Sequence, residues 1–156
     1  KSEDIAWERC DALYFKVGER TFAEGTIALV ADSDSLVNNL YYPFGQQVDG
    51  DPVLSVTVVK SHSLGQADLV QRVGEDLRRC CGIRTRSFLR HYAIEKALPR
   101  GNGLSMELRQ PGSPVFENVF MAGDYLLNAS LNAAMASGEA AAEALAAALQ
   151  APSPEV

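Results

Sequence analysis

The sequence predicts an α+β fold, in which a mostly antiparallel or mixed sheet is crossed by one helix and followed by a separate strand-turn-helix. Three observations carry this prediction. Several short apolar stretches have the period of two that is typical of strands. One central segment has apolar residues at helical spacing. An alanine-rich helical segment closes the chain after a short apolar strand.

The strands are expected where alternating apolar stretches are bounded by turn-forming residues such as Gly18 and Gly25. They cover residues 12–17, 26–31, 53–59, 87–93 and 119–122. We expect the first two to pair as a hairpin. Residues 36–43 combine strand and loop character, because Pro43 and Gly45 interrupt any regular element.

Two helices are expected, at residues 64–79 and 130–149. Ser63 and Gln66 have the spacing of a capping box, which predicts the start of the first helix. Turn chemistry at residues 99–103 predicts a turn and then a loop to Pro114. The proline-containing tail at residues 151–156 is expected to be disordered.

The chain has 156 residues, 47% of them hydrophobic, which is enough for one ordinary core. Its formal net charge of -6 disfavours nucleic acid as a partner, because phosphate binding needs a basic surface. The longest apolar stretch, at residues 140–149, is too weakly hydrophobic to form a transmembrane segment. The first residues lack a leader pattern and an initiator Met, so we expect a chain cut from a longer protein.

Three cysteines, Cys10, Cys80 and Cys81, form neither a CxxC pair nor a metal-ligand cluster with the two histidines. We therefore expect a reducing, cytoplasmic setting and no metal site. Cys80 and Cys81 are expected to be thiols at a helix end, and a strained vicinal disulfide is the alternative. His62 is expected to be solvated and His91 to have one face inward. Neither has a visible carboxylate partner, and no catalytic residue is assigned.

One local run is basic and comprises Arg78, Arg79, Arg84, Arg86, Arg90 and His91. The plainest interpretation is a helix end that complements the helix dipole, followed by a solvated strand face. The alternative is a surface that meets an anionic ligand or an acidic neighbouring domain.

The end of the chain has the residues of a binding site. Asp124 follows a short apolar strand, and Gly123 before it permits the close approach of a backbone. Asn128 or Ser130 can cap the following helix, whose first N–H groups attract an anionic or electron-rich group. The plainer alternative is that Asp124 merely caps the turn.

The closing helix is expected to have two different faces. A core stripe is expected from Leu131, Met135, Ala142, Leu145 and Leu149. Close approach of a backbone or a flat ligand is expected at the small residues Ala133, Ala134, Ser137 and Gly138. Glu139 and Glu143 mark the solvent side.

Residues 120–125 read FMAGDY and residues 130–145 read SLNAAMASGEAAAEAL, which resembles the closing motif of the amine oxidase and phytoene desaturase superfamily of FAD-dependent oxidoreductases. The resemblance implies that Asp124 binds the ribityl hydroxyls of FAD and that Gly123 allows the close approach. It also implies that the backbone of Ser130, Leu131 and Asn132 lies near the flavin C2 carbonyl. The order of elements upstream follows desaturase-like members less specifically.

The resemblance implies a C-terminal part of an FAD-dependent oxidoreductase that contributes one side of the flavin site and a substrate wall. Residues 1–114 would be a substrate-domain-like body, and residues 115–150 the closing strand and helix of the FAD-binding domain. The partner would be a missing N-terminal nucleotide-binding half, and the substrate a small apolar molecule or an amine. Tyr41, Tyr42, Phe44 and Tyr92 can line an apolar substrate pocket, or they are plain core and edge packing.

Two features depart from the family pattern. No G-x-G-x-x-G loop is present, since Gly101 and Gly103 are followed by Met106 where the third glycine belongs. Leu131 and Ala133 replace the methionine and the glycine that are common in the family's helix. We therefore expect this chain alone to be colourless and inactive. The alternative function is a stand-alone, non-catalytic binding or interaction module derived from that superfamily.

Overall fold

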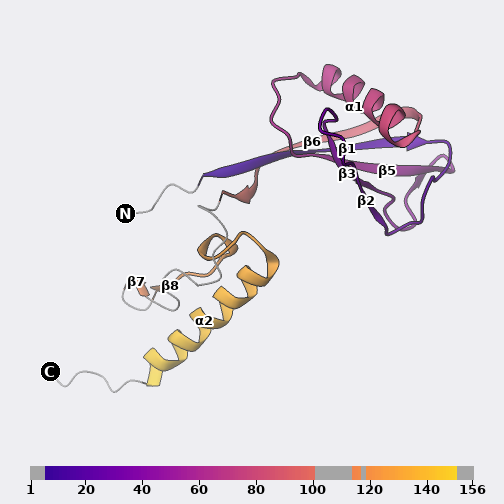
Figure 1. Cartoon of the computed structure of the whole chain (residues 1–156). Helices are drawn as coiled ribbons and strands as arrows, with labels where there is room; N and C mark the ends of the chain where they lie inside the picture. Colours follow the sequence, from indigo (N-terminus) through magenta and orange to yellow (C-terminus); the bar gives the residue numbers. More distant parts are fainter. Residues whose placement is uncertain (1–5, 101–113, 117–118, 151–156) are drawn as a thin grey trace. The chain divides into compact units, whose positions relative to one another are not determined.

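The computed structural model describes residues 6–100, 114–116 and 119–150 (Figure 1). The described chain divides into two compact units. The sheet unit is Arg9–Ala97, and the helix unit comprises the described parts of Lys1–Glu8 and Leu98–Val156. The fold is α+β with a mostly antiparallel sheet and one crossing helix, which confirms the predicted class.

The sheet is built from six strands, of which β1 and β6 begin or end just outside the sheet unit. They are β1 (Trp7–Val17), β2 (Ile27–Leu29), β3 (Val37–Tyr41), β4 (Gln47–Val48), β5 (Asp51–Val58) and β6 (Thr85–Pro99). The order is β2-β3-β5-β1-β6, and the short β4 pairs with β5. The pairs β1–β5, β2–β3, β3–β5 and β4–β5 are antiparallel. Strand β6 also runs antiparallel to β1, because Arg9 lies near Glu95, Asp11 near His91 and Phe15 near Phe88.

The expected hairpin between the first two strands is wrong. Strand β1 pairs with β5, and the three-residue β2 pairs with β3 at the edge of the sheet. The physical reason is burial: Leu13, Phe15 and Val17 alternate on one face of β1 and are at most 1% exposed. Their partner must bury the same face, which β5 does with Leu54, Val56 and Val58.

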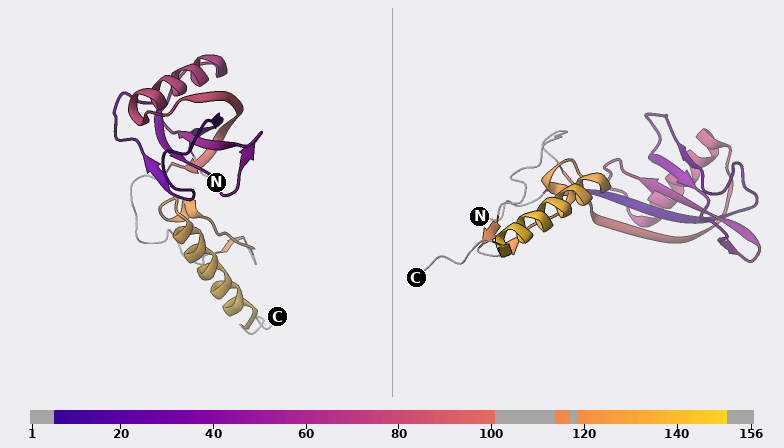
Figure 2. Two further views of the ribbon diagram at one scale, coloured as in Figure 1. Left: turned by 90° about the vertical axis from the view of Figure 1, so that its right-hand side faces the viewer. Right: turned by 90° about the horizontal axis from the view of Figure 1, so that it is seen from below.

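Helix α1 (Gln66–Cys81) connects β5 to β6 and covers one face of the sheet (Figures 1 and 2). Its buried apolar side chains are Leu69, Val73 and Leu77, as the helical spacing predicts. The core contains Leu13, Phe15, Val17, Val37, Leu40, Tyr42, Leu54, Val56, Val58, Leu69, Val73, Leu77 and Ile83. The opposite face of the sheet includes Tyr14, Ser55 and Tyr41, which lie side by side on β1, β5 and β3.

The capping box expected from Ser63 and Gln66 does not form. Gly65 remains extended, with φ −67° and ψ 165°, and no side chain caps the first turn. Gln66 is therefore the first helical residue, too early for the N3 position that a capping box requires. The helix ends at Gly82, whose φ of 67° is left-handed and whose N–H donates to the Leu77 carbonyl.

The helix unit contains β7 (Pro114–Phe116), β8 (Val119–Phe120), the short 3₁₀ helix η1 (Asp124–Leu126) and α2 (Leu131–Gln150). Strands β7 and β8 pair antiparallel. The strand and helix expected at the end of the chain are thus present. The glycines at 101 and 103, the loop to residue 113 and the tail from residue 151 lie outside the described residues.

No helix in the described part of the chain is long and apolar enough to span a membrane.

Candidate functional site

Asp124 lies in the turn between β8 and α2, as the first residue of η1. Its backbone carbonyl accepts the N–H groups of Leu127 (3.1 Å) and Ala129 (3.1 Å), which closes the turn. Its half-buried carboxylate accepts no hydrogen bond from a described residue. Among these residues Asp124 therefore shapes the turn through its backbone and leaves its carboxylate available to a ligand.

Ser130 caps the start of α2. Its Oγ accepts the N–H of Ala133 at 3.1 Å and donates to Asn128 Oδ1 at 2.6 Å. The N–H groups of Leu131 and Asn132 have no acceptor among the described residues, and both residues are exposed. The first turn of α2 thus offers two free donors at the positive end of the helix dipole.

The small face of α2 packs closely against the turn. Ser137 Oγ accepts the N–H of Gly123 at 2.9 Å and is also 3.0 Å from the Gly123 carbonyl oxygen and 3.0 Å from that of Ala134. Ala133 is 0% exposed and Ser137 2%. A Cβ at Gly123 would lie 2.3 Å from the ring of Tyr125, so only glycine fits here without a shift. At Ser137 the expected close approach is therefore made by the chain's own backbone, whereas a Cβ at Gly138 would meet no atom within 4 Å.

The core stripe expected on α2 is wrong for the helix unit. Leu131 is 78% exposed, Met135 67%, Leu145 40% and Leu149 77%, and Ala142 is exposed as well. The reason is that the turn contacts the small face, so the larger apolar side chains point away from it. Five apolar residues at spacings of three, four and seven form a continuous exposed stripe on α2.

A second group of polar side chains, which the sequence did not reveal, lies in the sheet unit. The Asp11 carboxylate of β1 binds His91 of β6, with 2.7 Å between Oδ1 and Nε2. Its other oxygen binds His62, with 3.1 Å between Oδ2 and Nε2. Arg9 lies 3.5 Å from Asp11 Oδ1. We name Asp11, His62 and His91 the histidine cluster.

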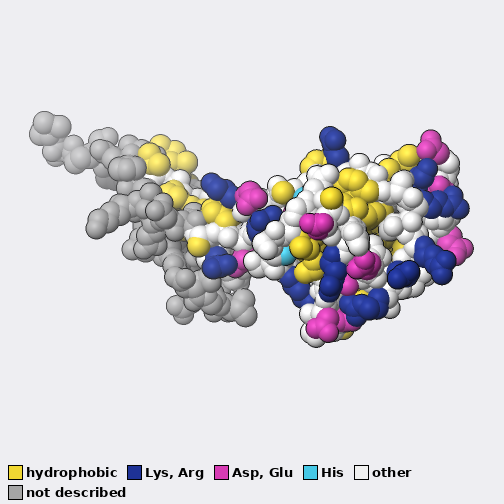
Figure 3. All heavy atoms as spheres, turned by 90° about the horizontal axis from the view of Figure 1, so that it is seen from above, with side chains coloured by type: hydrophobic (Ala, Val, Ile, Leu, Met, Phe, Trp, Pro, Cys, Tyr) yellow, Lys and Arg dark blue, Asp and Glu magenta, His cyan; other side chains and the backbone are white. Residues whose placement is uncertain are grey.

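The histidine cluster is almost closed to solvent. The side chain of Asp11 is 3% exposed, that of His62 7% and that of His91 11%. Only small parts of the histidine side chains reach the surface on the α1 side (Figure 3). The expectation of a solvated His62 is wrong, because the segment before α1 folds back over β1. The inward face expected for His91 is confirmed.

Asp11 is ionised in this surrounding. Burial alone would raise the pKa of Asp11, but the hydrogen bond from His91, the charge of Arg9 and the hydrogen bond from His62 outweigh it and hold this pKa below the ordinary value. An ionised carboxylate only accepts, so both Nε2 atoms carry hydrogen. Nδ1 of His62 is buried without a hydrogen-bond partner among the described residues. Within the part of the chain described, no three metal-ligating side chains could hold a metal ion.

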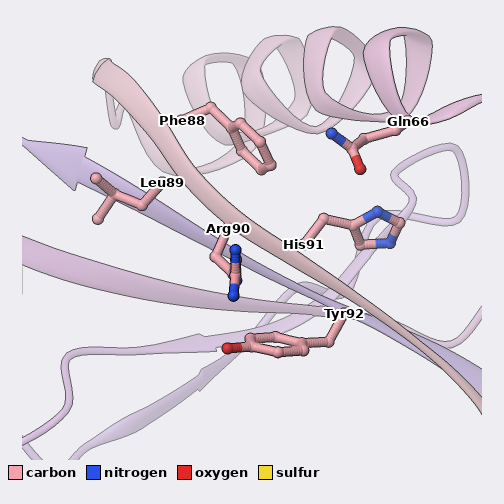
Figure 4. A pocket seen from close by; sticks show the side chains of 6 residues that line it. All are labelled: Gln66, Phe88, Leu89, Arg90, His91 and Tyr92. Carbon is pink, nitrogen blue, oxygen red and sulfur yellow. The ribbon is translucent and has the colours of Figure 1, made fainter.

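A shallow pocket of about 390 Å³ lies beside the cluster (Figure 4). It is lined by Gln66, Phe88, Leu89, Arg90, His91 and Tyr92. Gln66 and His91 face each other below α1, whereas Arg90 and Tyr92 lie on the other side of β6 (Figure 4).

The sheet face opposite α1 carries a row of tyrosines. Tyr14 of β1 and Tyr41 of β3 both lie opposite Ser55 of β5, so all three share one face. The rings of Tyr14 and Tyr92 meet edge to face at 6.0 Å. The aromatic residues that could line a substrate pocket therefore do not all lie together. Tyr41 and Tyr92 belong to this face, while Tyr42 is fully buried in the core.

The residues of the basic run do not form one common surface either. Arg79 binds Asp32 and Asp76, and Arg86 binds Asp51 at 2.6 Å. Arg78 and Arg79 lie in the last turn of α1, as the helix-dipole interpretation predicts. Cys80 and Cys81 end the helix as free thiols, and burial raises the pKa of both, so neither is an activated nucleophile.

Comparisons of the chain with known protein families and with curated proteins find no match.

Proposed function

We propose that this chain is the C-terminal part of an FAD-dependent oxidoreductase of the desaturase or amine oxidase kind. In this proposal it supplies one side of the flavin site and a substrate wall. The single observation that carries the proposal is the turn around Asp124. There a carboxylate and two helix N–H groups that have no partner among the described residues lie in the motif that resembles the superfamily's flavin-binding end.

The chemistry of this turn fits the cofactor that the resemblance implies. The Asp124 carboxylate would accept hydrogen bonds from the ribityl hydroxyls, and the N–H groups of Leu131 and Asn132 would donate to the C2 carbonyl. Ser130 holds these donors in place by capping the helix at Ala133. Gly123 keeps the turn close to α2 through Ser137. FAD, when bound, would accept a hydride from the substrate.

The exposed stripe on α2 supports a further domain against this unit. Four of its residues are large apolar side chains that are at least 40% exposed. Apolar surface of this kind marks an interaction site. In our proposal the nucleotide-binding half of the complete protein covers the stripe and holds the pyrophosphate and adenosine.

The tyrosine row is the proposed substrate wall. Tyr14, Tyr41 and Tyr92 present aromatic surface and phenol hydroxyls on the sheet face that α1 does not cover. Such a face suits a small apolar molecule or an amine, which aromatic rings bind by apolar contact and by cation–π attraction. The three free cysteines agree with a cytoplasmic setting, which we also propose.

The test is flavin binding by the complete protein. We expect it to bind FAD and the Asp124→Ala variant to bind about ten- to a hundredfold more weakly, because a hydrogen bond to a charged group contributes about 1.5 to 3 kcal/mol. Glu139→Ala is the matched control, since Glu139 is an exposed acid on α2. Equal affinity of the Asp124 variant and the control would remove Asp124 from the site.

This chain alone is expected to fold but to bind FAD only weakly. It presents one carboxylate and one helix end to a large dianionic ligand, and its net charge of -6 offers no long-range attraction. Flavin fluorescence and calorimetry on the purified chain measure this directly. Stoichiometric, submicromolar binding would contradict the proposal that a second half holds most of the cofactor.

A further inference from the structure

Strand β6 is the last strand of the sheet and is 15 residues long. Its inner side pairs with β1, and no described strand pairs with its outer side. An edge of this kind presents a row of backbone N–H and C=O groups that can pair with another chain. Short strands and inward charges usually protect such edges, but β6 is long and its exposed side chains include Tyr92 and Ile94.

The pocket beside the histidine cluster follows this edge. Five of its six lining residues are consecutive in β6, from Phe88 to Tyr92, and the sixth is Gln66 of α1 (Figure 4). A strand added along β6 would therefore run past the pocket mouth. Side chains of a strand alternate between its two faces, so one of them would point toward α1, between Gln66 and His91.

The pocket wall is held in place before any partner binds. His91 is fixed by its 2.7 Å hydrogen bond to Asp11, and Asp11 is also held by His62. Phe88 packs edge to face on Phe15 of the core at 5.9 Å. A wall that is already ordered loses little conformational freedom on binding, which favours affinity.

The charges along this edge favour an acidic partner. Arg84 and Arg90 are exposed and form no ion pair with any described residue, whereas Arg86 is engaged by Asp51. The guanidinium of Arg90 lies over the Tyr92 ring, 5.6 Å from its centroid, which keeps the charge near the edge. The first turn of α1, beside the pocket, has no side-chain cap, but it carries the exposed Asp68, so the positive charge of this edge comes from the two arginines.

We propose that the outer edge of β6 from Thr85 to Tyr92, together with the preceding Arg84, binds an extended acidic segment of another polypeptide by strand addition. One side chain of that segment occupies the pocket between Gln66 and His91. Main-chain hydrogen bonds supply affinity, and the pocket and the two arginines supply specificity. This inference does not depend on flavin binding, because all of its residues belong to the sheet unit.

The experiment uses the full 156-residue chain and an eight-residue peptide that alternates valine and glutamate. Amide shifts in NMR spectra report where the peptide binds, and a titration at rising salt reports the charge contribution. We expect shifts at residues 84–92 and at Gln66, and weaker binding as salt screens the arginines. The double variant Arg84→Gln/Arg90→Gln should weaken binding about tenfold, a loss of about 1.4 kcal/mol.

The control variant is Arg78→Gln, an exposed arginine of α1 away from the edge, which should bind as the parent does. Two further peptides are N-methylated at every second residue, one at the odd and the other at the even positions. The peptide whose methylated amides face β6 should not bind. The proposal is overturned if both methylated peptides bind like the parent peptide, if lysine replaces glutamate without loss, or if the shifts map to β2 or α2. Absence of binding at millimolar peptide, or a β6-paired dimer of the chain itself, would overturn it too.

Discussion

Replacing Asp11 by alanine is expected to destabilise the sheet unit more than any other single change in the histidine cluster. The carboxylate is 3% exposed and accepts one imidazole N–H at 2.7 Å and another at 3.1 Å. Alanine would leave both buried donors unsatisfied. Each unsatisfied buried group costs about 1 to 3 kcal/mol, so two unsatisfied imidazole donors should cost about 2 to 6 kcal/mol.

The assay is urea unfolding of the chain at neutral pH, followed by circular dichroism. Asp11→Asn should lose less stability than Asp11→Ala, because the amide oxygen still accepts from one histidine. Asp34→Ala is the control, since the Asp34 side chain is exposed and such changes usually alter stability by less than about 0.5 kcal/mol. If Asp11→Ala lost no more stability than this control, the inference that the cluster anchors β1, β6 and the segment before α1 would be refuted.

Three further outcomes are expected. The folded-state pKa of Asp11 is lowered, so the stability that its ionised carboxylate contributes is complete above the unfolded pKa of about 3.9 and disappears as the pH falls through the lower folded pKa. The stability difference between the parent and Asp11→Asn should therefore shrink below about pH 4. Asp76, 2% exposed, accepts the Leu36 N–H at 2.8 Å, so Asp76→Ala should cost about 2 kcal/mol and speed hydrogen exchange at Leu36; unchanged exchange would contradict this. Ala133→Leu should cost about 1 to 3 kcal/mol by overpacking, whereas the exposed Ala146→Leu should be neutral, and equal melting temperatures of the two variants would count against the close packing.

Local pattern was sufficient to predict the longer strands, both α-helices and the α+β class, but not the short elements β4, β7 and η1. The strand expected at residues 53–59 is β5, and the two expected helices are α1 and α2, each within a few residues. Apolar periodicity reflects burial on one face, which a helix or strand carries in its own sequence. The prediction of a capping box at Ser63 was wrong because the same residues also allow Gly65 to be extended. Only the path of the chain into α1 decides whether the helix begins after Ser63 or after Gly65.

The candidate flavin residues were accessible from sequence because Gly123, Asp124 and Ser130–Asn132 are close neighbours in one motif. The histidine cluster was not, because 51 residues separate His62 from Asp11 and 80 separate His91 from it. One signal was present in β1: Asp11 precedes Leu13, Phe15 and Val17 at the same spacing of two. An acidic residue in the register of a buried face requires a buried partner.

What the sequence by itself determined is the position of the longer strands and of both α-helices, and which short motif resembles a flavin-binding end. What only the tertiary structure decided is which strands pair, which carboxylate the histidines share, and which face of α2 is buried. Strand pairing and side-chain clusters join residues that are far apart in the chain, so no local period records them. The two faces of α2 both suit burial, and the contact of Ser137 with Gly123 selects the small one and leaves the apolar stripe exposed.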